Sequence, residues 1–440
     1  MGVHTKPSSL SEHTAPGLLT WPLLVAMVTM LTLGGCSRQA IRRQADVQRT
    51  MLTAPLPTAS PLVVNNKGPF QATLHLGEAL LERLAYTALA PRLNGAAQIS
   101  EIDAIPYLRV DAIRVSLPTC DRCIAIDLDL EMGVNPAGEG LLGTLIAEAA
   151  EHIRTEGRLS MEGRLSITNE ANQPGLTIND LQVTGVKLTG AVEASVALPR
   201  QLVEAGMRKV VDEALSQQTT APTIPLPLQA MVGTQPLKLT ALAVKTVRAN
   251  PGSPGGQVVL GVNTQVSAKS QTPIAFATDV GSREWGLTIS TSLVEAVIRR
   301  SLAPAGGALS RGPFDELRGL STDNEGLAAT VRMWKGGWFP YSQDYALSWT
   351  PSIDEGQPVA QNVAMSRGAG QGATRRAPKG DEALAVGERV LAQTQALSMG
   401  ATNWPASASL EARASLVGIH TSSEAITLVG DLVFGGAETH

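Results

Sequence analysis

The chain has 440 residues, of which 43% are hydrophobic and only 3% are aromatic, and its formal net charge is −4. A mildly acidic chain lacks the basic excess that nucleic-acid binding requires, so no nucleic-acid partner is expected. The length exceeds what one ordinary hydrophobic core accommodates and suits two domains.

The N-terminus resembles an export signal. An uncharged apolar run extends from Trp21 to Gly35 and ends in the sequence Leu-Gly-Gly-Cys at Cys36. A bilayer span needs about 20 apolar residues, so this run is short for a span and suits a signal peptide. The ending resembles the lipobox of bacterial lipoproteins. The resemblance implies a signal peptide over residues 1–35, a lipid on Cys36 and an outer-membrane location, with either face possible. An uncleaved anchor and an ordinary secretory signal are the alternatives.

Residues 36–67 begin with Arg38, Arg42 and Arg43 and become rich in Pro, Thr and Ser. This composition predicts a lipidated tether that separates the body from the membrane.

A first module is expected over residues 68–230. Strict apolar and polar alternation predicts long antiparallel strands with one buried face near 108–117, 124–134, 158–168 and 186–198. Apolar positions spaced three and four residues apart predict amphipathic helices after residue 78 and over 202–215.

Cys120 and Cys123 lie between two of these strands, at the ends of a predicted tight turn. The ends of such a turn are close enough for a disulfide, and an exported protein meets oxidising conditions. A structural disulfide is therefore predicted, with free thiols, redox catalysis and metal binding as alternatives.

A second module is expected over 231–440. Strands are predicted near 237–247, 258–266, 327–333, 410–419 and 425–434. Residues 352–382 are polar and rich in glycine, which predicts a mobile loop, and residues 383–399 fit either a helix or a strand.

One segment of the first module recurs in the second. Residues 74–91 align without a gap to residues 287–304, with identities that include Leu74/Leu287, Glu82/Glu295 and Pro91/Pro304. Each copy reads as a short strand followed by a helix that the proline closes. The repeat predicts two related halves.

This order of strands and helices resembles the tubular lipid-binding (TULIP) superfamily, whose best-known member is bactericidal/permeability-increasing protein. The resemblance implies an α+β fold of two end-to-end modules, each a long twisted antiparallel sheet wrapped around amphipathic helices, and each able to hold an acyl chain. The helix positions implied to face lipid are Leu80, Leu81, Leu84, Leu89, Met207, Val210, Val211, Leu293, Val294, Val297 and Ile298.

Catalytic signatures are missing from the sequence. It has no G-x-S-x-G, H-E-x-x-H, P-loop or dinucleotide fingerprint, and its histidines are dispersed. Asp127, Asp129 and Glu131 share one strand face and are interpreted as solvated carboxylates rather than metal ligands. No enzymatic activity, cofactor or metal is expected.

Aromatic residues concentrate between residues 334 and 349. Trp334, Trp338, Phe339 and Tyr341 could form an exposed tip that meets a membrane or a partner. The alternative is an aromatic plug inside the second module.

The sequence is compatible with two functions. The first is a lipid-anchored envelope protein that binds or shuttles amphipathic lipid in elongated apolar cavities. The alternative is a non-enzymatic structural or scaffolding lipoprotein that docks an envelope complex through a protein partner still unknown.

Overall fold

The structure is a computed structural model. It describes residues 20–58, 61–64, 68–99, 108–134, 153–170, 173–188, 200–216, 223–225, 231–232, 235–247, 256–266, 283–302, 312–336, 339–372, 390 and 411–435. The described chain is mixed helix and strand, with most residues in three large sheets, which confirms the predicted fold class at that level.

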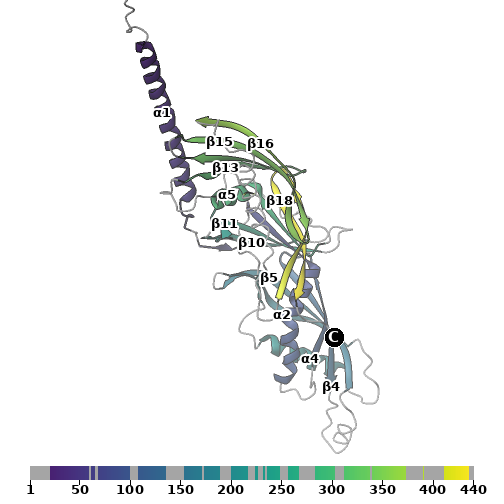
Figure 1. Cartoon of the computed structure of the whole chain (residues 1–440). Coiled ribbons are helices and arrows are strands. Elements are labelled where there is room, and N and C mark those ends of the chain that lie inside the picture. The colour runs from purple at the N-terminus through teal and green to yellow at the C-terminus, as the bar shows by residue number, and fades with distance from the viewer. Residues whose placement is uncertain are drawn as a thin grey trace, which may run out of the picture.

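A seven-stranded sheet occupies the middle of the molecule (Figure 1). Its strand order is β1-β10-β11-β2-β12-β18-β17, and all its pairs are antiparallel except β1 with β10. The strands are β1 (Val63–Val64), β2 (Ala72–Gly77), β10 (Leu239–Val247), β11 (Gln257–Thr264), β12 (Trp285–Ser290), β17 (Glu411–Thr421) and β18 (Ala425–Gly435).

A five-stranded antiparallel sheet extends from one end of this central sheet (Figure 1). It contains β3 (Leu108–Ser116), β4 (Cys123–Val134), β5 (Ile153–Glu170), β6 (Gln173–Leu188) and β7 (Thr223–Pro225). Helices α2 (Glu78–Ile99) and α4 (Arg200–Ser216) pack on its apolar face and on each other. A short hairpin, β8 (Met231–Val232) with β9 (Gln235–Pro236), follows.

A four-stranded antiparallel sheet lies at the opposite end. Its strands are β13 (Phe314–Thr322), β14 (Leu327–Lys335), β15 (Tyr341–Asp354) and β16 (Gln357–Gly372), and α5 (Thr291–Ser301) packs against β13. The predicted mobile loop at 352–382 is wrong over 357–372, because these residues pair with β15 along their length. Backbone pairing at a sheet edge does not require apolar side chains, so this polar strand carries no alternation that a sequence reading detects.

The sequence repeat is also a structural repeat. Strands β2 and β12 begin and end at equivalent positions of the two copies, and the first residue of α2 corresponds to the first residue of α5. The two strands are antiparallel neighbours, and Leu74 lies directly opposite its own counterpart Leu287. Strands β10 and β11 continue the sheet beyond β2, and β18 and β17 continue it beyond β12. The connectivity thus groups β10 and β11 with the first copy, and the expected boundary near residue 230 falls before them.

The two halves do not have separate cores. One cluster of buried apolar side chains includes Leu128 from the five-stranded sheet, Leu74 and Leu287 from the central sheet and Val331 from the four-stranded sheet. The central sheet therefore joins the two ends of the molecule, and the division into two modules at residue 230 stays a prediction.

Two expected element boundaries are wrong. Helix α2 continues through Pro91 to Ile99 instead of ending at the proline. Its later turns keep tertiary contacts, since Leu93 is buried and the Asn94 side chain accepts a hydrogen bond from the Val110 amide at 2.8 Å. These contacts offset the backbone bond that proline removes. The first part of the predicted tether is also helical, as α1 spans Thr20–Thr53.

Replacing Gly430 by alanine is expected to destabilise the central sheet strongly. An added Cβ would lie 2.1 Å from the Ser415 carbonyl oxygen and 2.8 Å from the Trp285 ring, so backbone would have to move. Overpacking of this kind costs about 3 kcal/mol. Chemical denaturation measures the loss, with Gly319→Ala as the control, because a Cβ at Gly319 meets nothing within 4 Å. Equal stability of the two variants would contradict this packing.

Candidate functional site

The candidate site in the first half is the apolar space between two helices and the five-stranded sheet. Leu80, Leu81, Leu84 and Leu89 of α2 are at most 4% exposed, and Met207 and Val211 of α4 are fully buried. The side chain of Val210 lies outside the described residues. The expected lipid-facing stripe thus points inward on both helices, which a lipid site and an ordinary core both require.

The sheet approaches α4 closely at Gly157. A Cβ at this position would lie 2.8 Å from the Met207 methyl carbon of α4 and 3.2 Å from the Met132 methyl carbon of β4. Methionine side chains fill this space, and their three rotatable bonds let them rearrange at low cost. This part of the interior is closed in the described structure and has adaptable walls.

The equivalent helix of the second half is α5. Leu293, Val294, Val297 and Ile298 are all buried, but they divide between two clusters. Val294 and Ile298 belong to the main core, whereas Leu293 and Val297 pack with Val266. The sequence repeat predicted that all four side chains face one lipid site, but in the structure they belong to two different clusters.

An open groove of about 390 Å³ crosses the outer face of the four-stranded sheet. It runs over all four strands at one level, where Ser321, Ala328, Ser348 and Ala364 are paired neighbours. Its lining has no charged residue: Gly319, Leu320, Ser321, Ala328, Ala329, Thr330, Ala346, Leu347, Ser348, Ala364, Met365 and Ser366. Sequence reasoning missed this groove, because small outward residues on separate strands become neighbours only once the register is known.

The predicted aromatic tip is largely wrong. Trp334 and Tyr341 are 1% and 2% exposed, and Tyr345 and Trp349 are also buried. Trp338 lies outside the described residues. Phe339 is 46% exposed, and the Arg38 guanidinium lies 4.9 Å from its ring centroid. Most of the cluster is buried as in a plug, because α1 covers Trp334 and the core covers the residues of β15.

Residues 37–53 of α1 are anchored on the four-stranded sheet. Ile41 and Leu52 pack with Phe314 and Trp334 in a small separate cluster. Arg49 is 5% exposed, donates to the Gly312 carbonyl at 2.7 Å and lies over the Phe314 ring. The segment predicted as a tether is therefore a packed helix over this range.

Charged groups beside Trp334 are paired. Its indole NH donates to Glu316 at 2.8 Å, and Arg332 forms two hydrogen bonds with Asp344, at 2.6 and 2.8 Å. The hydrogen bonds to Asp344 raise the pKa of Arg332 against the lowering effect of burial, so this guanidinium stays charged. The guanidinium lies 5.6 Å from the centroid of the Trp334 ring.

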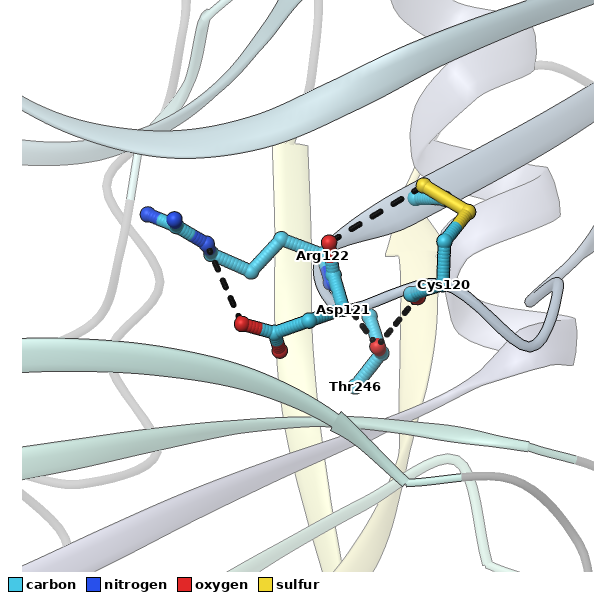
Figure 2. Close-up of a disulfide and its surroundings, with 5 residues drawn as sticks. Cys120, Asp121, Arg122 and Thr246 are labelled. Carbon is cyan, nitrogen blue, oxygen red and sulfur yellow. Dashed lines mark hydrogen bonds and ion pairs between the residues drawn. A yellow bond between two sulfur atoms is a disulfide. The ribbon is translucent and has the colours of Figure 1, made fainter.

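The predicted disulfide between Cys120 and Cys123 is present, with a Cα–Cα distance of 5.5 Å. Figure 2 shows the turn it closes beside Thr246 of β10. The Thr246 hydroxyl donates to the Cys120 carbonyl at 3.5 Å and accepts from the Arg122 amide at 3.1 Å, and the Leu165 amide donates to the Arg122 carbonyl at 2.7 Å. The turn thus links the five-stranded sheet to the central sheet.

Reducing this disulfide is expected to lower the free energy of unfolding by about 2 kcal/mol, the value for a loop of about four residues. Denaturation with and without a thiol reductant measures the difference. The Cys120→Ser, Cys123→Ser double variant serves as the control, since it should be equally destabilised and insensitive to reductant. A wild-type protein unaffected by reduction would contradict this role.

Two of the three carboxylates on β4 form ion pairs across the sheet, and the third, Asp127, accepts a hydrogen bond from the Ser160 hydroxyl at 2.5 Å. Asp129 bridges Arg114 at 2.5 Å and Arg158 at 2.9 Å, and Glu131 pairs with Arg109. No group of residues in the described ranges could hold a metal ion. The outer face of the five-stranded sheet is therefore charged, unlike that of the four-stranded sheet.

No protein-family model matches the chain, and no curated protein matches its sequence. Among solved structures, P47 of Clostridium botulinum E1 aligns at 9% identity with a TM-score of 0.37, covering 83% of this chain and 100% of that chain. A lipopolysaccharide binding protein aligns at 8% identity with a TM-score of 0.32, covering 84% and 100%. Both similarities are too low to carry an argument about function.

Proposed function

We propose that this chain is a lipid-anchored protein of a bacterial envelope that binds or shuttles amphipathic lipid, with its acyl chain in the first half. The observation that carries the proposal is the aliphatic composition of that interior. Among the described residues between 78 and 225, which supply α2, α4 and the five-stranded sheet, every buried hydrophobic side chain is aliphatic or methionine, whereas the buried core of the second half includes Trp285, Tyr345 and Trp349.

Aliphatic side chains match an acyl chain chemically. Each methylene group moved from water into such an interior gains about 0.8 kcal/mol, so a chain of about twelve carbons gains roughly 10 kcal/mol before the entropic costs of binding. The methionines between α4 and the sheet supply side chains that can move to admit it. A TULIP-like fold of two related halves is part of the same proposal.

Membrane attachment through Cys36 completes the proposal. It rests on the Leu-Gly-Gly-Cys sequence that ends at Cys36. By length and hydropathy, no helix among the described residues could cross a membrane. Mass spectrometry of the mature N-terminus tests the attachment: a lipid on Cys36 is expected, and an unprocessed Met1 would contradict it.

An exchange experiment tests lipid binding. The full chain is incubated with vesicles that contain phospholipid labelled in its acyl chain, and is then separated from them and analysed. Protein carrying labelled lipid, displaceable by unlabelled lipid, is expected. Protein that repeatedly returns without label would contradict the proposal.

A scaffolding role is the second candidate, and the groove on the four-stranded sheet favours it. An uncharged, exposed and open surface of this kind suits a protein partner. Two results together would establish this role instead. The wild-type chain would carry no exchangeable lipid, and its envelope complex would be lost in the Ala346→Arg variant but kept in the Ala79→Arg control, which changes an exposed position of α2.

A further inference from the structure

The side chains around the start of the packed part of α1 are basic and exposed. Arg38, Arg42 and Arg43 follow Cys36 without an intervening acidic residue, and all three are exposed. At a rise of about 1.5 Å per residue, Arg43 lies only about 10 Å along the helix from Cys36. That separation is close to the Debye length at physiological salt, so a charged surface at Cys36 acts on all three arginines.

The next turns of α1 fix the helix to the body. A Cβ at Gly372 would lie 2.8 Å from the Ile41 terminal methyl, so the end of β16 touches α1 about 8 Å along the helix from Cys36. Further along, Arg49 binds the Gly312 carbonyl, and the Ala54 carbonyl accepts from Arg300 of α5 at 3.0 Å. These contacts to β16, β13 and α5 allow α1 little freedom to swing.

We propose that α1 is a rigid strut that holds the β16 edge of the body against an anionic membrane surface, with Arg38, Arg42, Arg43 and Phe339 contacting its headgroups. The inference rests on the proposed lipid anchor at Cys36. Figure 1 shows α1 at the end of the molecule opposite β4, so the five-stranded sheet lies on the side away from the membrane.

Charge and aromatic character both fit this partner. Each arginine near an anionic membrane contributes about 1 kcal/mol, roughly a fivefold change in affinity. Phe339 is exposed, and the guanidinium of Arg38 lies over its ring. An apolar ring next to a cation suits the interface between headgroups and acyl chains.

The test places a fluorescent donor at one of two exposed positions of the full-length acylated chain. Gln371→Cys on β16 reports the proposed membrane edge, and Glu156→Cys, near the end of β5 that lies away from the central sheet, reports the far end. Energy transfer to an acceptor in the bilayer is measured on phosphatidylcholine vesicles with and without phosphatidylglycerol. Transfer from position 371 should exceed transfer from position 156, and phosphatidylglycerol should increase the difference.

Two variants test the rigid attachment of α1 and its positive charge separately. The Arg38→Gln, Arg42→Gln, Arg43→Gln triple variant should lose the effect of phosphatidylglycerol, whereas Lys209→Gln, which removes a charge on α4, should retain it. The Ile41→Ala, Arg49→Ala double variant frees α1 from the body. Energy transfer from the two donor positions should then become similar, while the sheets melt at the wild-type temperature.

The outcomes distinguish the inference from the proposed function. Wild-type protein that floats with neither kind of vesicle would overturn the lipid anchor and with it the proposed function. Anchored protein with equal transfer from both positions, or a triple variant that still responds to phosphatidylglycerol, would overturn the strut alone.

Discussion

The Leu84→Trp variant is expected to lose lipid uptake while its melting temperature falls only slightly. Leu84 is 4% exposed and belongs to the buried stripe of α2 that faces the five-stranded sheet. If an acyl chain occupies this space, the indole ring takes the place of several methylene groups and the chain no longer fits. Labelled-lipid uptake and thermal unfolding, measured on the same preparation, give both values.

The control for this variant is Ala79→Trp, which adds the same ring to an exposed position of α2. It should take up lipid like the wild type. In a fully packed core, Leu84→Trp would cost on the order of 1–3 kcal/mol through overpacking. A large fall in melting temperature, from a protein with no lipid to lose, would refute a lipid-accommodating interior.

The Trp334→Ala variant is expected to lose about 3–5 kcal/mol, the usual cost of deleting a buried tryptophan. The ring is 1% exposed and packs against Phe314, Ile41 and Leu52, and its NH donates to Glu316. Its loss leaves α1 without its main apolar contact, so residues 37–53 should open more often than the rest of the chain. Hydrogen exchange along α1, together with global denaturation, measures both effects.

Phe339→Ala is the matched control, because this exposed ring contributes little to packing. It should leave stability and exchange in α1 nearly unchanged. Unchanged exchange in α1 of the Trp334→Ala variant would mean that the helix does not depend on the Phe314–Trp334 cluster.

Local patterns predicted much of this structure. The alternation from Ile124 to Val134 predicted β4 with its buried face, since a half-buried strand has a period of two. The turn between two strands predicted the disulfide at Cys120 and Cys123. The repeat of residues 74–91 predicted two strand–helix units, and both begin at equivalent positions.

Long-range contacts were not predictable in the same way. Nothing in the sequence indicates that β2 and β12 are neighbours, although their pairing joins the two copies of the repeat in one sheet. The packing of α1 depends on Phe314 and Trp334, which lie far away in the sequence. From the sequence, Trp334 and Tyr341 could lie at the surface, and only the tertiary structure shows that they are buried.

The candidate site was also predictable in its local features and not in its long-range contacts. The inward positions on α2, α4 and α5 follow from helical periodicity, because amphipathic helices bury their apolar stripe. Whether that stripe faces a ligand depends on how closely the five-stranded sheet approaches the helices. The close approach of Gly157 to Met207 is an example. The groove on the four-stranded sheet needed the strand register before its lining could be recognised.

Native mass spectrometry of the full chain, purified without detergent after release from its membrane, tests the central claim most directly. The account predicts a population heavier than the lipid-modified polypeptide by the mass of an intact lipid, which dissociates on activation and disappears in Leu84→Trp but not in Ala79→Trp. A single species at the mass of the modified polypeptide, unchanged after incubation with lipid vesicles, would contradict it.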